Sequence, residues 1–282
     1  MIQRLVEEGA NPAEFVRGPP LAVNDLLSGE TRSGVCTRKT ALSVAVYYEN
    51  KEIITELVTS AGADVNQSLG AAGTVLHAAS DDLVPHLLQL GADPHATGGR
   101  TDTALGHSLR IFVDVTTNRG LSLTLGHERE PQSALRKINI LLFVTGNLDA
   151  ILEEGLRALR GETLDTECVT LFLQHGARIS YRQLCRAMFY RPRLQRCERF
   201  IELLLAADTD FSVARFDKYG LNSPPNLTVL FQKLSKPMTL QAWCVISVRR
   251  QLRSVSDRGM WARIEKLPLP SIITDQLKLI VW

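Results

Sequence analysis

Cysteine and histidine, the side chains best suited to catalysis or metal binding, lack the spacing that such a site needs in this chain. No two cysteines form a C-x-x-C pair; they stand at Cys36, Cys168, Cys185, Cys197 and Cys244. Paired spacing is typical of structural zinc sites and disulfide frameworks. We therefore expect reduced, mostly buried thiols and a protein of the cytoplasm or the nucleus.

The histidines give no better support to catalysis. His77, His86 and His95 follow one another at intervals of nine residues, too far apart for a local pair of metal ligands. His127 lacks the second histidine of an H-E-x-x-H motif, and no histidine follows Cys244 that could act as its base. Glycine-rich phosphate-binding motifs are also absent from the sequence. We expect a protein that is not an enzyme and that holds no metal or cofactor.

The composition is that of an ordinary folded protein, with one local concentration of arginine. The 282 residues are 45% apolar and 22% charged, with a net charge of +2, and no uncharged run is long enough to span a membrane. Arginines 182 to 199 form the densest charged patch, interleaved with aromatic residues. A solvated surface is the default interpretation. The sharper hypothesis is that Arg191, Arg193 and Arg196 bind an acidic or phosphate-bearing protein substrate; nucleic-acid binding is a weaker alternative.

A repeated phrase indicates how the chain is built. Apolar segments with helical periodicity end in Gly9-Ala10-Asn11, Gly62-Ala63-Asp64, Gly91-Ala92-Asp93 and Gly176-Ala177-Arg178. Glycine adopts the left-handed conformation that ends a helix at little cost, so each phrase predicts a helix C-terminus.

A second phrase precedes two of these helices and carries a family resemblance. Thr40-Ala41-Leu42 and Thr74-Val75-Leu76-His77 each predict a threonine-capped short helix, and Thr103-Ala104-Leu105 is a weaker copy. Together the phrases resemble the T-P-L-H-x-A-A and L-L-x-x-G-A-D phrases of the ankyrin repeat, with alanine or valine in place of the proline.

The spacing of the helix-ending positions supports a repeat array. Gly9, Gly62, Gly91, Gly146, Gly176 and Ala207 are separated by 53, 29, 55, 30 and 31 residues, against an ankyrin period of about 33. We predict insertions in the two long intervals, near 18–34 and 115–132. The array of about five to six repeats would span residues 1–212, with the first repeat truncated, and 213–236 would be a degenerate capping segment.

The region 237–282 predicts three short helices. Thr239 is a good N-cap for a helix on which Leu240, Cys244 and Val248 recur every fourth residue and form one apolar stripe. Met260 starts a second helix, which Leu267-Pro268-Leu269-Pro270 stops, and Ser271 is the expected cap of the third. A unit this small needs partners for stability.

This region resembles the SOCS box, and ankyrin repeats followed by a SOCS box are the layout of the ankyrin repeat and SOCS box family. The resemblance implies that Thr239, Leu240, Cys244 and Val248 bind elongin C of the elongin B/C pair. It also implies that Leu267, Pro268, Leu269, Pro270 and Ile273 contact cullin-5, which carries a RING-box protein. The family's downstream leucine, lysine and tyrosine are replaced here by Ile273, Thr274 and Gln276.

The sequence therefore predicts an all-α protein, an ankyrin-repeat solenoid with a C-terminal three-helix SOCS box. The resemblance implies a substrate-recognition subunit of an elongin–cullin–RING ubiquitin ligase, in which the repeats bind a target protein that the sequence does not identify. Two other functions stay open: an ankyrin scaffold outside any ligase, whose last helices only cap the stack, and an arginine-rich nucleic-acid binder.

Overall fold

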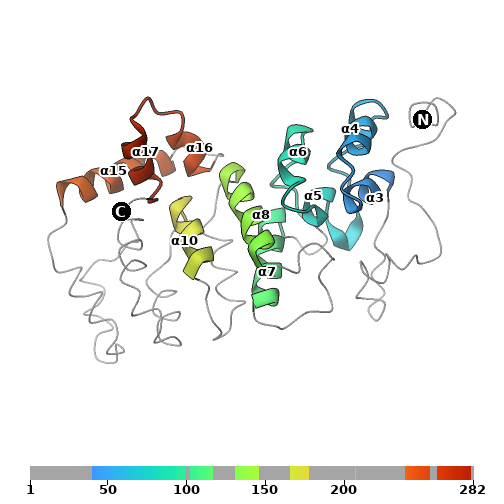
Figure 1. Cartoon of the computed structure of the whole chain (residues 1–282), viewed down its shortest axis with the longest axis horizontal. Coiled ribbons are helices and arrows are strands. Elements are labelled where there is room, and N and C mark those ends of the chain that lie inside the picture. The colour runs from blue at the N-terminus through green and yellow to red at the C-terminus, as the bar shows by residue number, and fades with distance from the viewer. Residues whose placement is uncertain are drawn as a thin grey trace. The chain divides into compact units, whose positions relative to one another are not determined.

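The computed structural model describes residues 40–98, 102–116, 131–145, 166–177, 207, 239–254 and 259–280. Over these ranges the secondary structure is helical, with an isolated β-bridge between Thr97 and Thr103 and no strand, as an all-α fold requires. Figure 1 shows the helices in chain order. They belong to two compact units that divide between Leu141 and Leu142. Across the same ranges, no helix has both the length and the apolar character needed to cross a bilayer.

Paired helices build the first unit. The pairs are α3 (Ala41–Tyr47) with α4 (Lys51–Thr59), α5 (Val75–Ala78) with α6 (Val84–Gln89), and α7 (Ala104–Thr116) with α8 (Pro131–Val144); a 3-10 turn, η1 (Gly70–Ala72), precedes α5. Helix α5 contacts both α3 and α7. The first helices of successive pairs therefore lie side by side, as in a stack of repeats.

The threonine phrases start helices as predicted. The Thr40 hydroxyl accepts a hydrogen bond from the Ser43 N–H at 3.1 Å, and the Ser43 hydroxyl accepts one from the Thr40 N–H at 2.9 Å. This reciprocal arrangement is a capping box, which satisfies two backbone donors that a helix start leaves open. At α5 the ring of His77 takes the same place, because its Nδ1 accepts from the Thr74 N–H at 3.1 Å.

The helix-ending glycines also behave as predicted. Gly62, Gly91 and Gly176 have φ values of 70°, 93° and 103°, in the left-handed region that only glycine adopts readily. Gly9 and Gly146 lie outside the described residues, as do the boundaries predicted at 212 and 236 and most of the predicted insertions.

Side chains tie the segment of α3 and α4 to the segment of α5 and α6. The amide of Asn66, in the loop after α4, donates to the Gly91 carbonyl at 3.1 Å and accepts from the Asp93 N–H at 2.7 Å. Nearer the helices, the Thr55 hydroxyl lies 2.9 Å from Nε2 of His86. Both links join the segment that contains α3 and α4 to the segment that contains α5 and α6, so polar bonds as well as apolar packing hold the two segments together.

His77 has a structural role inside this unit. Because Nδ1 accepts a hydrogen bond from the backbone N–H of Thr74, the ring proton is on Nε2, which donates to the Asp102 carbonyl at 3.0 Å. Burial is the main cause of a lowered pKa for His77, so the ring is neutral at physiological pH. The carbonyl of His77 accepts from the buried ammonium of Lys137 at 2.9 Å. Because both ring nitrogens of His77 are engaged in hydrogen bonds, His77 is not a metal ligand.

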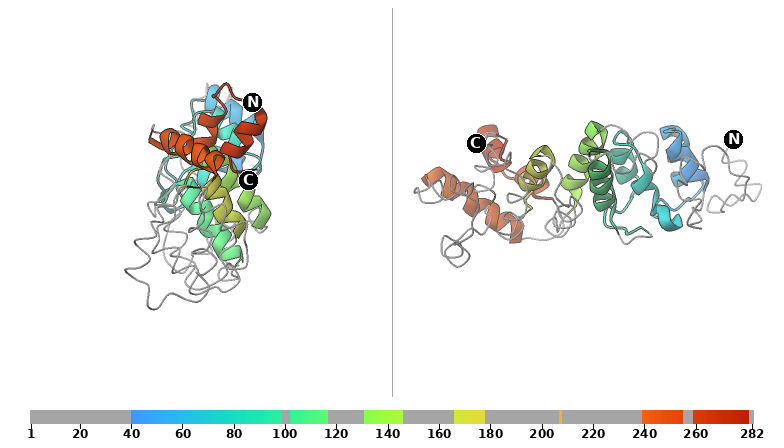
Figure 2. Two further views of the ribbon diagram at one scale, coloured as in Figure 1. Left: turned by 90° about the vertical axis from the view of Figure 1, so that its left-hand side faces the viewer. Right: turned by 90° about the horizontal axis from the view of Figure 1, so that it is seen from below.

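The second unit joins α10 (Thr166–Gln174) to α15 (Leu240–Ser254), α16 (Met260–Ile264) and α17 (Ser271–Leu277). Helix α15 contacts both α16 and α17, and the views in Figures 1 and 2 agree on this grouping. The predicted cap of α15 is confirmed, since the Thr239 hydroxyl accepts from the Ala242 N–H at 3.2 Å.

The predicted cap of the last helix is wrong. Pro270 is the N-cap of α17, and Ser271 is its first helical residue. Proline fits just before a helix because its φ is already near the helical value and it has no N–H to leave unsatisfied. The helix ends at Leu277, and Leu279 has a φ of 58°, so Ile280 lies beyond the helix.

Two glycines provide a matched test of this packing. A Cβ on Gly259, at the start of α16, would lie 2.3 Å from the Phe143 carbonyl oxygen, whereas one on Gly106, within α7, has no atom closer than 3.7 Å. Gly259→Ala forces backbone apart and should destabilise the protein by about 2 kcal/mol or more. Gly106→Ala should stabilise it by about 0.5–1 kcal/mol, because alanine loses less entropy in a helix. Urea unfolding measures both; equal effects would contradict this packing at Gly259.

Candidate docking surface

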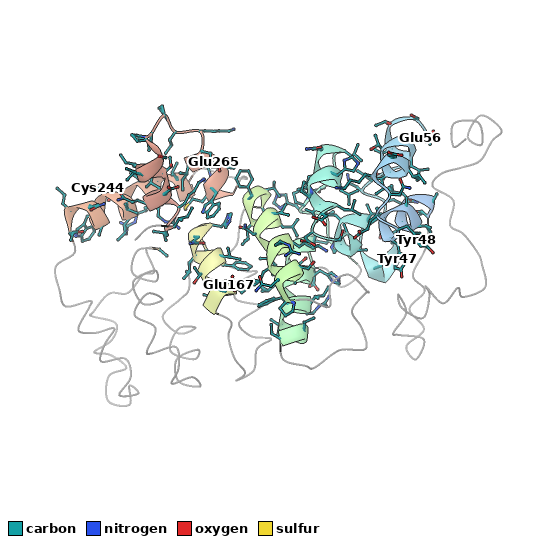
Figure 3. The ribbon with its side chains drawn as sticks, viewed as in Figure 1. Tyr47, Tyr48, Glu56, Glu167, Cys244 and Glu265 are labelled. Carbon is teal, nitrogen blue, oxygen red and sulfur yellow. The ribbon has the colours of Figure 1, made fainter. Side chains whose placement is uncertain are left out.

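Helix α15 has two apolar faces, and the chain covers one of them. With about 100° between successive residues, Ala242, Val245, Ile246 and Arg249 point to one side, and all four are buried. The predicted stripe points the other way: Leu240 is 81% exposed, and Cys244 and Val248 are exposed as well. Figure 3 labels Cys244 in the first half of this helix. The stripe is therefore a surface and not part of the core.

Arg249 fixes which face of α15 is buried. Its side chain is 0% exposed, and its guanidinium donates to the carbonyls of Leu173 and Gln174 at the end of α10 and to that of Leu277 at the end of α17. The last carbonyls of a helix have no partner within it and carry partial negative charge. One planar cation with five donors can satisfy two such helix ends at once.

An aromatic stack completes the contact with α10. The ring of His175 stacks on Trp261 of α16, with centroids 4.2 Å apart, and the indole N–H of Trp261 donates to the Gln174 carbonyl at 3.1 Å. Burial, then the charges of Arg249 and Lys278, lower the pKa of His175 to about 3. A neutral imidazole is therefore part of the folded structure.

The predicted cullin-contacting residues form a second exposed surface. Pro268, Leu269 and Pro270 are exposed in the connection between α16 and α17, and Leu267 is half-buried. At the start of α17, Ile273 is exposed, and the adjacent Ile272 is 71% exposed. Thr274 and Gln276 are half-buried, and the Thr274 hydroxyl donates to the Ser271 carbonyl at 2.7 Å. The threonine is thus occupied within its own helix.

The remaining candidate residues are arginines that the sequence places between α10 and α15. Arg191, Arg193 and Arg196 lie outside the described residues, so the substrate-binding and nucleic-acid hypotheses for them stay predictions. Among the described residues, no group of three or more histidine, cysteine or acidic side chains could hold a metal ion.

Two residues of α15 were missed by the sequence analysis. Trp243 lies beside the stripe and is half exposed. Arg249 is the buried side chain that clamps α15 to the ends of α10 and α17. The i, i+3 relation of Trp243 to Leu240 could have placed it on the same surface. Nothing in the local sequence distinguishes Arg249 from Arg250, which is exposed.

Comparison with known proteins supports one ankyrin repeat, in the first unit. The ankyrin repeat family model matches residues 37–68, the segment that contains α3 and α4. An ankyrin repeat implies a role in protein–protein interaction, and this part of the predicted fold is confirmed. No curated protein gives a significant match to the chain. The resemblance of 237–282 to a SOCS box stays a prediction.

The buried imidazole of His175 predicts a loss of stability in acid. Because its pKa is about 3 in the folded protein and about 6.5 in an unfolded chain, its contribution is fully present above pH 6.5 and declines as the pH falls towards 3. Between pH 6.5 and 5 the loss should be about 2 kcal/mol. His175→Phe keeps the stack on Trp261 and should remove that part of the pH dependence, measured by urea unfolding at several pH values. A parallel pH dependence in both proteins would contradict the assignment.

Proposed function

We propose that this protein is the substrate-recognition subunit of an elongin–cullin–RING ubiquitin ligase. In this proposal the ankyrin repeats hold the target protein, the exposed stripe of α15 binds elongin C, and the surface around Pro268 and Ile273 contacts cullin-5. The target itself is a protein not yet identified, and the site of action is the cytoplasm or the nucleus.

The exposure of Leu240, Cys244 and Val248 carries the proposal. These residues fit the T-L-x-x-x-C-x-x-x-hydrophobic pattern of an elongin-binding helix, and they stand outward while the opposite face of α15 packs on its own unit. A helix that presents residues at i, i+4 and i+8 can lay them into a partner's apolar groove. A helix that only capped a repeat stack would have been expected to bury this stripe.

The receptor in such a complex performs no bond chemistry. It raises the effective concentration of the target near the ubiquitin-carrying enzyme, and other subunits supply catalysis. This division of labour agrees with a sequence in which no catalytic constellation was found.

The first test removes the stripe. Leu240→Ala combined with Cys244→Ala should abolish co-purification with elongin B/C, because both residues lose the apolar contacts that would fill the groove. Ile272→Ala is the matched control: it removes an equally apolar, exposed side chain from α17 and should leave elongin binding unchanged. Survival of the complex in the double variant, or no complex with the unaltered chain, would refute the proposal and favour an ankyrin scaffold.

A second test separates the two surfaces. Pro268→Ala with Leu269→Ala should keep elongin B/C bound but weaken recruitment of cullin-5 to that complex by at least about tenfold, since both residues are exposed next to α17. Lys266→Ala changes an exposed neighbour and should have no effect. Pull-down of cullin-5 by the purified ternary complex measures the difference; undiminished recruitment would remove this surface from the cullin assignment.

A further inference from the structure

The exposed face of α15 is wider than the three-residue stripe. Trp243 is 51% exposed and lies in the first turn of the helix, one turn after Leu240 and next to Cys244. Its backbone N–H donates to the Thr239 carbonyl at 3.1 Å. At about 100° per residue, Trp243 lies some 60° to one side of Leu240 and Val248 some 80° to the other. The apolar surface therefore continues past the stripe on the tryptophan side.

The sequence of α15 becomes basic towards its C-terminus. The helix has no aspartate or glutamate in its sequence and carries Arg249, Arg250 and Arg253. Arg249 is buried, whereas Arg250 is exposed and lies seven residues, or two turns, after Trp243. Because this flank presents an indole, a complementary surface would offer it an apolar pocket.

A half-exposed tryptophan next to an apolar stripe is well suited to anchor an interface. Tryptophan and arginine are the residues most often found to dominate binding energy, and large exposed apolar clusters mark interaction sites. The large hydrophobic residues that α15 exposes are Leu240, Trp243 and Val248, all on the face opposite Arg249. The backbone under them is held by the Thr239 cap and by the Arg249 clamp, so the anchor is presented by a pre-ordered helix.

We propose that Trp243 is an anchor residue of the docking surface on α15. This inference rests on the proposed function and takes its elongin partner as the occupant. It adds that the partner receives the indole in an apolar pocket beside the groove for Leu240 and Cys244. Trp243 then contributes much of the affinity of the complex.

The experiment measures binding of purified elongin B/C to the full-length chain by calorimetry. Trp243→Ala should raise Kd by at least about tenfold, and Trp243→Phe should recover most of that loss because an aromatic ring still fills the pocket. Gln241→Ala, an exposed change on the other flank of the same turn, should leave Kd within about twofold of the original. Circular dichroism and urea unfolding of each variant show whether the fold is kept.

The outcomes separate this inference from the function on which it rests. If Leu240→Ala with Cys244→Ala abolishes binding but Trp243→Ala leaves Kd unchanged, the anchor assignment is overturned and the ligase proposal stands. If the unaltered chain does not bind elongin B/C, both fail. If the free chain self-associates through Trp243 and Trp243→Ala does not change elongin binding, the docking surface is occupied by a second copy of the chain and the inference is wrong.

Discussion

The clamp made by Arg249 is the contact on which the second unit depends. A guanidinium removed from water is costly, and here hydrogen bonds to carbonyls at the ends of α10 and α17 offset that cost. The α10 carbonyls also have other donors, since Gln174 accepts from the indole N–H of Trp261 and Leu173 from the Gly176 N–H, so Arg249 adds a second bond there. A contact of this kind adds specificity more than net stability, because only one orientation of α15 brings the Arg249 guanidinium to the ends of both α10 and α17. The outward direction of Leu240 and Cys244 follows from that orientation.

The first unit uses the same device with a different residue. Lys137 of α8 is buried, and its ammonium donates to the carbonyl of His77 in the last turn of α5. Next to it, Asp81 accepts from Ser133 and Arg136; burial raises the pKa of Asp81, but these bonds outweigh it and the net pKa is lowered. In both units a long basic side chain from one helix completes the end of another. Short helices leave a large share of their carbonyls open, which explains why such partners are needed.

Local rules predicted what is local in this structure. Thr40 and Thr74 begin helices, Gly62 and Gly91 end them, and Thr239 caps α15, because each effect depends on a few adjacent residues. The face of α15 that would be buried could not be predicted, since Val245 and Ile246 are as apolar as Leu240 and Val248. A contact between residues 75 positions apart, Arg249 and Gln174, decides it. The role of Ser271 was mistaken because proline before a helix competes as the cap.

The exposed apolar face of α15 also affects the protein when no partner is bound to it. A face on which Leu240, Trp243 and Val248 meet water is the kind of surface that promotes unspecific association and recognition by chaperones and proteases. Covering that face with a partner would shield it, by mass action, in proportion to how much partner is present. The cellular amount of this protein would then follow the supply of whatever covers α15, and surplus chains would be the first to be lost.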